Sequence, residues 1–253
     1  MNDLEQYFRN NDNRLIDKWI HYFEVYDRHF SRFRNKGAVM LEIGVFQGGS
    51  LQMWKAYLGE GTKIYAIDID PRCKQFEEEN IKIFIGSQSD AAFLREVKSQ
   101  IPDLDILLDD GGHTMRQQIV TFNELYDKVK DDGVYACEDL HTSYWSGYGG
   151  GKGRPGTFIE YSKKRIDQLN AFHSQSKRFK PTEFTRSTDS MHYYDSMLII
   201  EKKRRAMPIR EQTGQSSFEI PNLPFPNKLA KYKEMASNYL DAFLRKLGSG
   251  NQT

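Results

Sequence analysis

The chain has 253 residues, with 36 lysines and arginines against 35 aspartates and glutamates, so its formal net charge is +1. That length suits one α/β domain with a sizeable hydrophobic core. The balanced charge supplies none of the positive field on which non-specific nucleic-acid binding depends, and we expect no nucleic-acid partner.

The first residues do not have the pattern of a secretory signal, because MNDLEQYFRNND is polar and contains acids. No apolar run approaches the length needed to cross a membrane. The two cysteines, Cys73 and Cys137, stand far apart and outside any C-x-x-C pattern, which is typical of reduced thiols. We therefore expect a cytoplasmic protein without a membrane partner.

Large apolar residues recur every three or four positions between Trp19 and Phe33, a spacing typical of one face of an amphipathic helix. We expect this helix to pack on the edge of a sheet or to cover a cofactor, and we assign residues 1–36 to an N-terminal helical segment. The apolar face consists of Trp19, Tyr22, Phe23, Tyr26, Phe30 and Phe33.

Short apolar runs of strand character follow Gly37 and alternate with segments that have helical patterns. Runs of about six apolar residues between helices indicate βαβ units, and hence a parallel sheet that is buried on both faces. The prediction is a doubly wound α/β domain over residues 37–205. The predicted strands are 38–45, 63–68, 81–86, 104–110 and 133–139, and the predicted helices are 48–58, 72–79, 90–99 and 114–129.

A glycine-rich loop is predicted at 143–156, and a helix follows it at 157–172. The segments KPTEFTRS and MHYYDSMLIIEKK then predict two closing strands, joined by a turn at 188–190. Residues 206–253 are predicted as a tail, in which the Pro-rich stretch EIPNLPFPN precedes a helix over KLAKYKEMASNYLDAFLRKL. This helix is expected either to dock back on the domain or to mediate self-association.

Ligands of open α/β sheets bind at the carboxyl ends of the strands, so chemistry is expected in the strand-to-helix turns. In the first turn, LEIGVFQGGS, the glycines Gly44, Gly48 and Gly49 let the backbone turn tightly and approach a ligand. Asp68 ends the second strand, where an acid can accept hydrogen bonds from both hydroxyls of a ribose. Since the pyrophosphate type of glycine spacing is missing, this pattern favours an adenosine that carries no phosphates.

The third turn, GSQSD, places Gln88, Ser89 and Asp90 near the expected position of an adenine ring. Asp90 has an equally good alternative role as the N-cap of the next helix. Neither G-x-S-x-G nor H-E-x-x-H occurs, so the serine-hydrolase and zincin interpretations lack their signatures.

Acidic residues end two neighbouring strands of the predicted sheet. Asp109 and Asp110 end the fourth strand, and Glu138 and Asp139 end the fifth. Adjacent parallel strands lie about 5 Å apart, so these ends should face each other beside the cofactor turn. Crowded carboxylates repel one another unless they are protonated or share a cation, and a hard ion such as Mg²⁺ fits best. Helix capping is the alternative for each acid taken alone.

His113 follows Asp110 by three residues and is assigned as a general base. An alcohol with a pKa near 15.7 and a histidine with a pKa near 6.5 differ by roughly nine units, or about 12 kcal/mol. Coordination of the hydroxyl to a dication narrows this gap, and binding through two vicinal hydroxyls fixes the nucleophile. A metal with a base is therefore a stronger hypothesis than either alone. A capping or packed histidine is the alternative.

Together, LEIGVFQGGS, YAIDIDP, GSQSD, LLDDGGH and CEDLHTSYW resemble the metal-dependent sugar O-methyltransferases related to the mycinamicin and macrocin tailoring enzymes, over roughly residues 15–202. The resemblance implies methyl transfer from S-adenosylmethionine to a sugar hydroxyl, with Mg²⁺ or Mn²⁺ as the metal. It also implies a seven-stranded sheet of order 3-2-1-4-5-7-6 whose seventh strand is antiparallel. Carried over by motif, the metal ligands are Asp110, Glu138 and Asp139, and His113 is the base.

The first turn is also similar to that of catechol O-methyltransferases, which implies that Gly44 and Ser50 lie near the methionine part and Asp68 on the ribose. Tyr144 and Trp145, with glycines 149–151, predict an acceptor wall and lid, because aromatic faces pack on sugar rings; a flexible loop is an equal alternative. His141 is expected close to the acceptor, and a structural or surface histidine is the alternative. The predicted cofactor-binding residues are Glu42, Gly44, Gly48, Ser50, Asp68, Gln88, Ser89 and Asp109.

The acceptor is open among antibiotic, capsular, lipopolysaccharide and nucleotide-linked sugars. One alternative keeps the fold and cofactor but methylates a catechol-like phenol, whose more acidic hydroxyl needs less activation. Another is a module that binds an adenosyl ligand without chemistry, which His113 and the crowded acids disfavour. The macrolide enzymes are longer and carry a large N-terminal domain, so their oligomeric arrangement is not assumed; a homo-oligomer through the N-terminal helix or the tail stays open.

Overall fold

The computed structural model describes residues 1–218 together with residues 237 and 240. It divides into two units, Met1–Pro208 and Ile209–Thr253, and the fold described here is that of the first. The predicted Pro-rich stretch lies outside the described residues, as does almost all of the predicted C-terminal helix. Within the described part of the chain, no helix has both the length and the apolar character needed to span a membrane.

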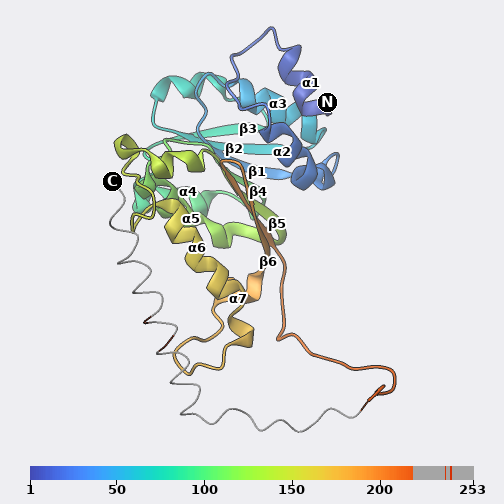
Figure 1. The fold of residues 1–253 in the computed structure, drawn as a ribbon. Coiled ribbons are helices and arrows are strands. Elements are labelled where there is room, and N and C mark those ends of the chain that lie inside the picture. The colour runs from blue at the N-terminus through green and yellow to red at the C-terminus, as the bar shows by residue number, and fades with distance from the viewer. Residues whose placement is uncertain (219–236, 238–239, 241–253) are drawn as a thin grey trace. The chain divides into compact units, whose positions relative to one another are not determined.

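Seven strands form one sheet of order β3-β2-β1-β4-β5-β7-β6 (Figure 1). Strands β1 to β5 run parallel, and β7 runs antiparallel to both β5 and β6. The predicted fold class and strand order are therefore confirmed. The strands are β1 (Val39–Ile43), β2 (Lys63–Asp68), β3 (Ile81–Ile85), β4 (Leu104–Asp109), β5 (Val129–Cys137), β6 (Thr188–Tyr194) and β7 (Met197–Lys202).

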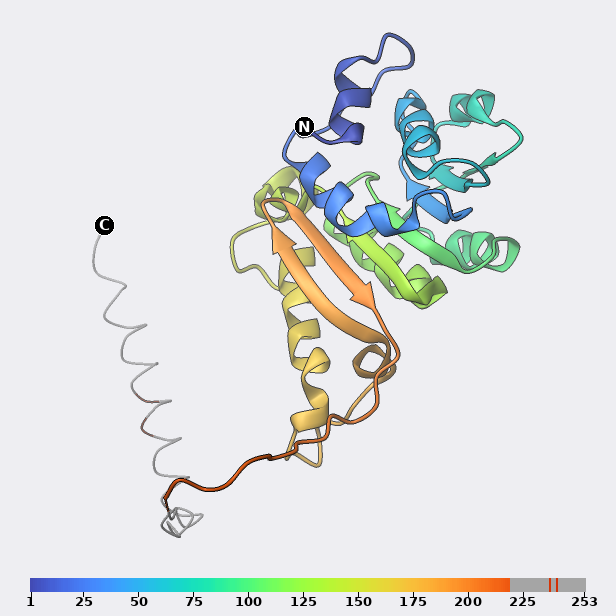
Figure 2. The same cartoon turned by 90° about the vertical axis from the view of Figure 1, so that its right-hand side faces the viewer.

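Helices cover both faces of this sheet (Figures 1 and 2). One buried hydrophobic cluster joins α1, α2 and α3 to one face and includes Trp54, and a second joins α4 to α7 to the other face and includes Phe122. Ile106 and Leu107 are neighbours in β4 but belong to different clusters, which explains why the strands are continuous apolar runs. The helices are α1 (Asp3–Arg9), α2 (Tyr22–Phe30), α3 (Gly49–Leu58), α4 (Ala91–Gln100), α5 (Met115–Leu125), α6 (Phe158–Leu169) and α7 (Glu183–Ser187).

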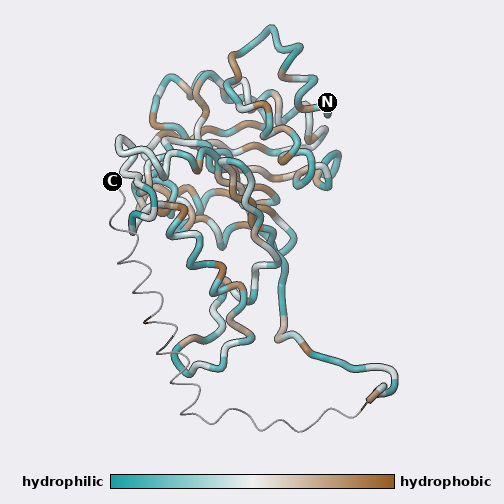
Figure 3. Tube along the Cα trace, viewed as in Figure 1, coloured by the Kyte–Doolittle hydropathy of each residue, from teal (hydrophilic) through white to brown (hydrophobic). Residues whose placement is uncertain are grey.

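The hydropathy of the chain follows this layering, because hydrophobic residues gather in the strands while the outer loops are hydrophilic (Figure 3). The carboxyl ends of β1, β2, β4 and β5 meet at one edge of the sheet. The strand order reverses between β1 and β4, and this is the point at which open α/β sheets bind ligands.

The predicted N-terminal helix begins later than its apolar pattern indicated. Helix α2 starts at Tyr22, and Trp19 lies in the turn before it, where its carbonyl accepts the Tyr22 amide at 3.0 Å. The Trp19 side chain is 55% exposed, so its assignment to the buried face is wrong. The other residues of that face are buried in the first cluster, and α2 therefore packs on a face of the sheet rather than on its edge.

The predicted position of the two closing strands is also wrong. Residues 180–187 are predicted as a strand, but 183–187 form α7, because the Thr182 hydroxyl accepts the amide of Thr185 in a capping box. Strand β6 begins at Thr188, inside the predicted turn. The chain instead turns at Asp195 and Ser196, where Ser196 has a φ of 60°. Two further differences are small: residues 71–76 form a 3₁₀ helix, and the glycine-rich loop contains a 3₁₀ turn at 146–148.

Candidate active site and metal centre

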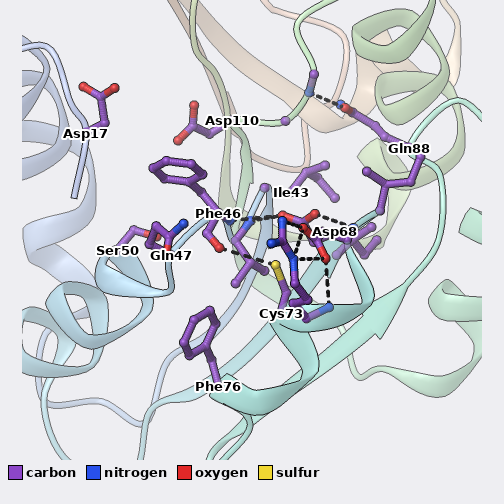
Figure 4. A pocket seen from close by; sticks show the side chains of 18 of the residues that line it. Asp17, Ile43, Phe46, Gln47, Ser50, Asp68, Cys73, Phe76, Gln88 and Asp110 are labelled. Carbon is purple, nitrogen blue, oxygen red and sulfur yellow. Dashed lines mark hydrogen bonds and ion pairs between the residues drawn. The ribbon is translucent and has the colours of Figure 1, made fainter. Parts of the chain in front are cut away.

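A cavity of about 520 Å³ opens at the carboxyl ends of β1, β2 and β4 (Figure 4). The first strand-to-helix turn forms one side of it, and residues 15–18, which precede α2, form another. Its volume is in the range of small-molecule sites. Among the predicted cofactor residues, Gly44, Ser50, Asp68 and Gln88 line this cavity, whereas Glu42, Gly48, Ser89 and Asp109 lie outside its lining.

The first turn is held by its contacts with two other strand ends. Gly44 has a φ of 98°, and a Cβ at this position would lie 2.1 Å from the carbonyl oxygen of Asp110. The amides of Val45 and Phe46 donate to Asp68 Oδ2 at 2.8 and 3.1 Å. Asp68 therefore fixes the turn while its side chain faces the cavity (Figure 4).

Glu42 acts on the cavity through a neighbour. Its fully buried carboxylate accepts the Ser50 hydroxyl at 3.0 Å and the Trp54 indole N–H at 3.1 Å. Burial raises the pKa of Glu42 to about 7. Ser50 lines the cavity, and its hydroxyl donates to Glu42. Glu42 therefore orients this hydroxyl although it does not line the cavity itself.

Gln88 joins the third turn to the loop after β4. Its side-chain amide donates to Asp109 Oδ1 at 2.5 Å, and its side-chain carbonyl accepts the Gly112 amide at 3.0 Å. Burial raises the pKa of Asp109 to about 7. Asp109 thus holds Gln88 in place from behind the cavity.

The remaining residues of the third turn have local partners. The Ser89 hydroxyl contacts the Ser87 hydroxyl at 3.0 Å. Asp90 accepts the amides of Ala92 and Phe93 at 2.9 and 3.2 Å, and it is the N-cap of α4. Of its two predicted roles, capping is the one that this geometry shows.

The ends of β4 and β5 bring together Asp110, His113 and Asp139, each of which offers one ligand atom within 4.8 Å of the others. His113 Nε2 lies 3.4 Å from Asp139 Oδ2 and 3.8 Å from Asp110 Oδ1. The Tyr22 hydroxyl donates to Asp139 Oδ1 at 2.8 Å. His113 and Asp139 have φ values of 54° and 55°. Residues other than glycine rarely adopt this backbone conformation, and those that do are concentrated at functional sites.

Helix capping does not account for this cluster. Thr114, not His113, caps α5, with a complete capping box to Gln117. Asp139 precedes a 3₁₀ turn but makes no capping hydrogen bond with its side chain. His113 Nδ1 is buried and has no hydrogen-bond partner among the described residues.

Glu138 belongs to the same edge, but its carboxylate faces inward and is 1% exposed. Both of its oxygens lie 3.0 Å from Lys18 Nζ, and the Tyr26 hydroxyl donates to Oε1. The same ammonium contacts Asp110 Oδ2. Asp110 thus belongs to two groups: it lies in the cluster with His113 and Asp139, and it shares Lys18 with Glu138, which is not a member of that cluster.

Lys18 is a site residue that the sequence did not indicate. Its side chain is 2% exposed and comes from the segment before α2. Burial alone would lower the pKa of Lys18, but the carboxylates of Asp110 and Glu138 outweigh it and raise the pKa above its usual range. No motif surrounds this lysine, and its partners lie 92 and 120 residues further along the chain.

An aromatic wall, formed by Trp19, His141 and Trp145, borders the acidic cluster. The His141 ring contacts both indoles, and its centroid lies 5.9 Å from that of Trp19 and 4.6 Å from that of Trp145. Its Nδ1 lies 3.9 Å from Asp139 Oδ1. Trp145 is 50% exposed, and Tyr144 beside it is 55% exposed. Of the predicted acceptor residues, His141 therefore lies at the cluster and Trp145 packs against it, and Trp19 is an unexpected third member of this wall.

Comparisons with known proteins identify the kind of domain to which this site belongs. Residues 41–140 match the family model of a methyltransferase domain. The chain is 33% identical over 198 residues to 8-demethyl-8-alpha-L-rhamnosyl tetracenomycin-C 2'-O-methyltransferase of Streptomyces olivaceus, which covers 74% of this chain and 52% of that protein. It is 35% identical over 204 residues to demethylmacrocin O-methyltransferase of Streptomyces fradiae, with 74% and 51% covered. The chain thus spans about half the length of these curated relatives.

The fold is similar to that of a solved structure, the MycE methyltransferase from the mycinamycin biosynthetic pathway in complex with Mg and SAH. The TM-score is 0.70 at 31% identity, over 80% of this chain and 54% of that one. A MycE complex that also contains mycinamycin VI gives a TM-score of 0.70 at 28% identity, over 92% and 58% of the two chains.

Proposed function

The chain belongs to the methyltransferases and is related to sugar O-methyltransferases, and on this premise we propose that it transfers the methyl group of S-adenosylmethionine to a sugar hydroxyl. The observation that carries this proposal is the position of Asp110. It lines the cavity next to the first turn and also belongs to the cluster with His113 and Asp139. A donor in the cavity and an acceptor at the cluster would therefore be neighbours.

The cavity supplies groups suited to each part of the donor. The Ser50 hydroxyl and the open backbone at Gly44 suit the methionine part. Asp68, at the end of β2, suits the ribose hydroxyls, and Gln88 stands where the adenine would lie. This assignment follows the chain's own lining residues and is supported by the SAH in the MycE complexes.

Asp110, Glu138 and Asp139 would hold the metal, because carboxylate oxygens are the ligands that Mg²⁺ prefers, and Mn²⁺ accepts the same donors. A dication bound there supplies Lewis acidity that makes a sugar hydroxyl easier to deprotonate. His113 Nε2 takes the proton, since it faces the carboxylates of both strand ends. The Tyr22 hydroxyl holds Asp139 in orientation.

The aromatic wall is proposed as the acceptor side. Its exposed indole faces suit the apolar face of a sugar ring, and the His141 ring that they pack against lies next to Asp139. The relatives named above methylate a rhamnosyl tetracenomycin and demethylmacrocin, which favours a natural-product saccharide as the acceptor class.

Methyl transfer from labelled S-adenosylmethionine to a panel of glycosides and catechols tests the proposal. Activity on glycosides should stop in excess EDTA and return with Mg²⁺. The variant Asp110→Asn should lose turnover, and Asp127→Asn, which changes an exposed aspartate paired with Lys98, serves as the matched control. Full activity in excess EDTA would contradict the metal assignment, and turnover of catechols alone would contradict the acceptor.

A further inference from the structure

We propose that the Lys18 ammonium occupies the place of the metal when no metal is bound. In that state it pairs with Asp110 and Glu138, and it leaves these carboxylates when a divalent cation binds. This inference rests on the proposed function, because it concerns the same carboxylates. It assigns a role to a residue outside every motif of the sequence.

The contacts of Lys18 are those of a cation bound between two ligands. Its Nζ lies 3.0 Å from both oxygens of Glu138 and also contacts Asp110 Oδ2. The side chains of Lys18 and Glu138 are each 2% exposed. Lysine is almost never so deeply buried unless it is paired, and here it is paired with two predicted metal ligands.

The charges around Lys18 favour competition between its ammonium and a dication. A single ammonium faces Asp110 and Glu138, with Asp139 beside them, so the carboxylates outnumber the positive charge. A dication held by the same oxygens would need lone pairs that Lys18 now occupies, and the two cations would repel each other. Removal of the lysine charge should therefore strengthen metal binding, by about tenfold or more.

Lys18 also connects the metal ligands to the wall of the cofactor cavity. Residues 15–18 line the cavity, and the backbone of Arg14 and Leu15 packs against the first turn of α3. A Cβ on Gly49 would lie 2.4 Å from the carbonyl oxygen of Leu15 and 2.5 Å from that of Arg14. A change at the Lys18 ammonium therefore reaches the donor site, and metal binding and cofactor binding are expected to be coupled.

Isothermal titration of Mg²⁺ into the full chain tests the sign of this effect. The variant Lys18→Met keeps most of the side-chain volume without the charge and should bind Mg²⁺ at least about tenfold more tightly than the unchanged chain. Lys55→Met is the matched control, because Lys55 pairs with Glu78 at the surface of α3 and should leave the affinity unchanged. A purely structural ion pair predicts equal affinity, and equal or weaker binding by Lys18→Met would overturn the proposal.

A second measurement uses the unchanged chain and does not depend on how the variant folds. Acetylation of lysine amines, read by mass spectrometry, should leave Lys18 protected in EDTA and reactive in saturating Mg²⁺, while Lys55 reacts equally in both. Protection of Lys18 under both conditions would overturn the proposal. Absence of Mg²⁺ binding in every variant would overturn both this proposal and the metal assignment. If Lys18→Met binds Mg²⁺ more tightly than the unchanged chain but no sugar is methylated, only the proposed function is contradicted.

Discussion

The carbonyl oxygen of Asp110 occupies the space that a side chain on Gly44 would need. A Cβ added to Gly44 would lie 2.1 Å from this oxygen. The Asp110 amide also donates to the carbonyl of Ile43 at 3.0 Å, so the first turn and the end of β4 are in backbone contact. The proposed donor and metal sites therefore share one wall, and a change in this wall should affect both.

Gly44→Ala should destabilise the fold by about 3 kcal/mol or more, because the new methyl group clashes with backbone and the residue must keep a φ of 98°. Urea denaturation measures this loss. Gly147→Ala is the control: a Cβ there meets nothing within 4 Å, and its effect should stay within about 0.5 kcal/mol. Equal stabilities of the two variants would contradict the tight approach at Gly44.

His113→Ala should lower kcat by about 10² to 10⁴-fold while the affinity for S-adenosylhomocysteine stays unchanged, since the proposed base contributes to proton transfer and not to donor binding. Single-turnover kinetics and calorimetry measure the two quantities. His173→Ala removes an exposed histidine and should change neither. If His113 were merely packed, His113→Ala would lose stability but retain its turnover per folded molecule.

The cluster of Asp110, His113 and Asp139 could be predicted because it follows from local rules. Strand ends that carry acids are visible in the sequence, and parallel neighbours bring their carboxyl ends to one edge of the sheet. The position of Lys18 could not be predicted in this way. It lies outside any regular element, and its contacts with Asp110 and Glu138 depend on how the first residues cross a sheet formed much later in the chain.

Periodicity misled the prediction where a regular spacing continued past the end of an element. Trp19 is three residues before Tyr22 and fits the helical face, yet the chain enters α2 only at Tyr22 and leaves the indole beside His141. The segment KPTEFTRS is likewise predicted as a strand, but the capping box of Thr182 and Thr185 starts a short helix there. In both places a local hydrogen bond marks the boundary: a backbone bond from Tyr22 to Trp19 before α2, and the side-chain bonds of the capping box before α7.

Asp90→Ala should cost about 1 kcal/mol of stability, the usual price of losing an N-cap, because the amides of Ala92 and Phe93 lose their acceptor. Donor affinity should not change. Thermal denaturation and titration with S-adenosylhomocysteine separate the two effects. A loss of affinity at unchanged stability would instead support the contact with adenine that the sequence left open.

Glu42 should make the stability of the ligand-free protein fall as the pH rises. Burial raises its pKa from 4.5 to about 7, so between these values the folded state holds a proton that the unfolded chain releases. This contribution is fully present below the unfolded pKa and is lost as the pH rises through the folded pKa. Glu42→Gln removes the titration, and the unchanged chain should lose about 2 to 3 kcal/mol more than this variant between pH 5 and pH 8.

Urea denaturation at several pH values measures this difference. Glu60→Gln is the control, because Glu60 is exposed and its removal should leave the pH profile parallel to that of the unchanged chain. Parallel profiles for Glu42→Gln as well would show that the Ser50 and Trp54 hydrogen bonds keep Glu42 ionised in the folded state.

Trp19→Ala should raise the KM for the acceptor sugar roughly fivefold to tenfold, because an aromatic face is worth about 1 kcal/mol in such a contact. Trp19→Phe keeps an aromatic face and should lie close to the unchanged chain, and Phe179→Ala, which removes another exposed aromatic ring, should have no effect. Affinity for S-adenosylhomocysteine should be the same in all three, since Trp19 does not line the donor cavity. An unchanged acceptor KM for Trp19→Ala would mean that the acceptor reaches His113 without touching the aromatic wall.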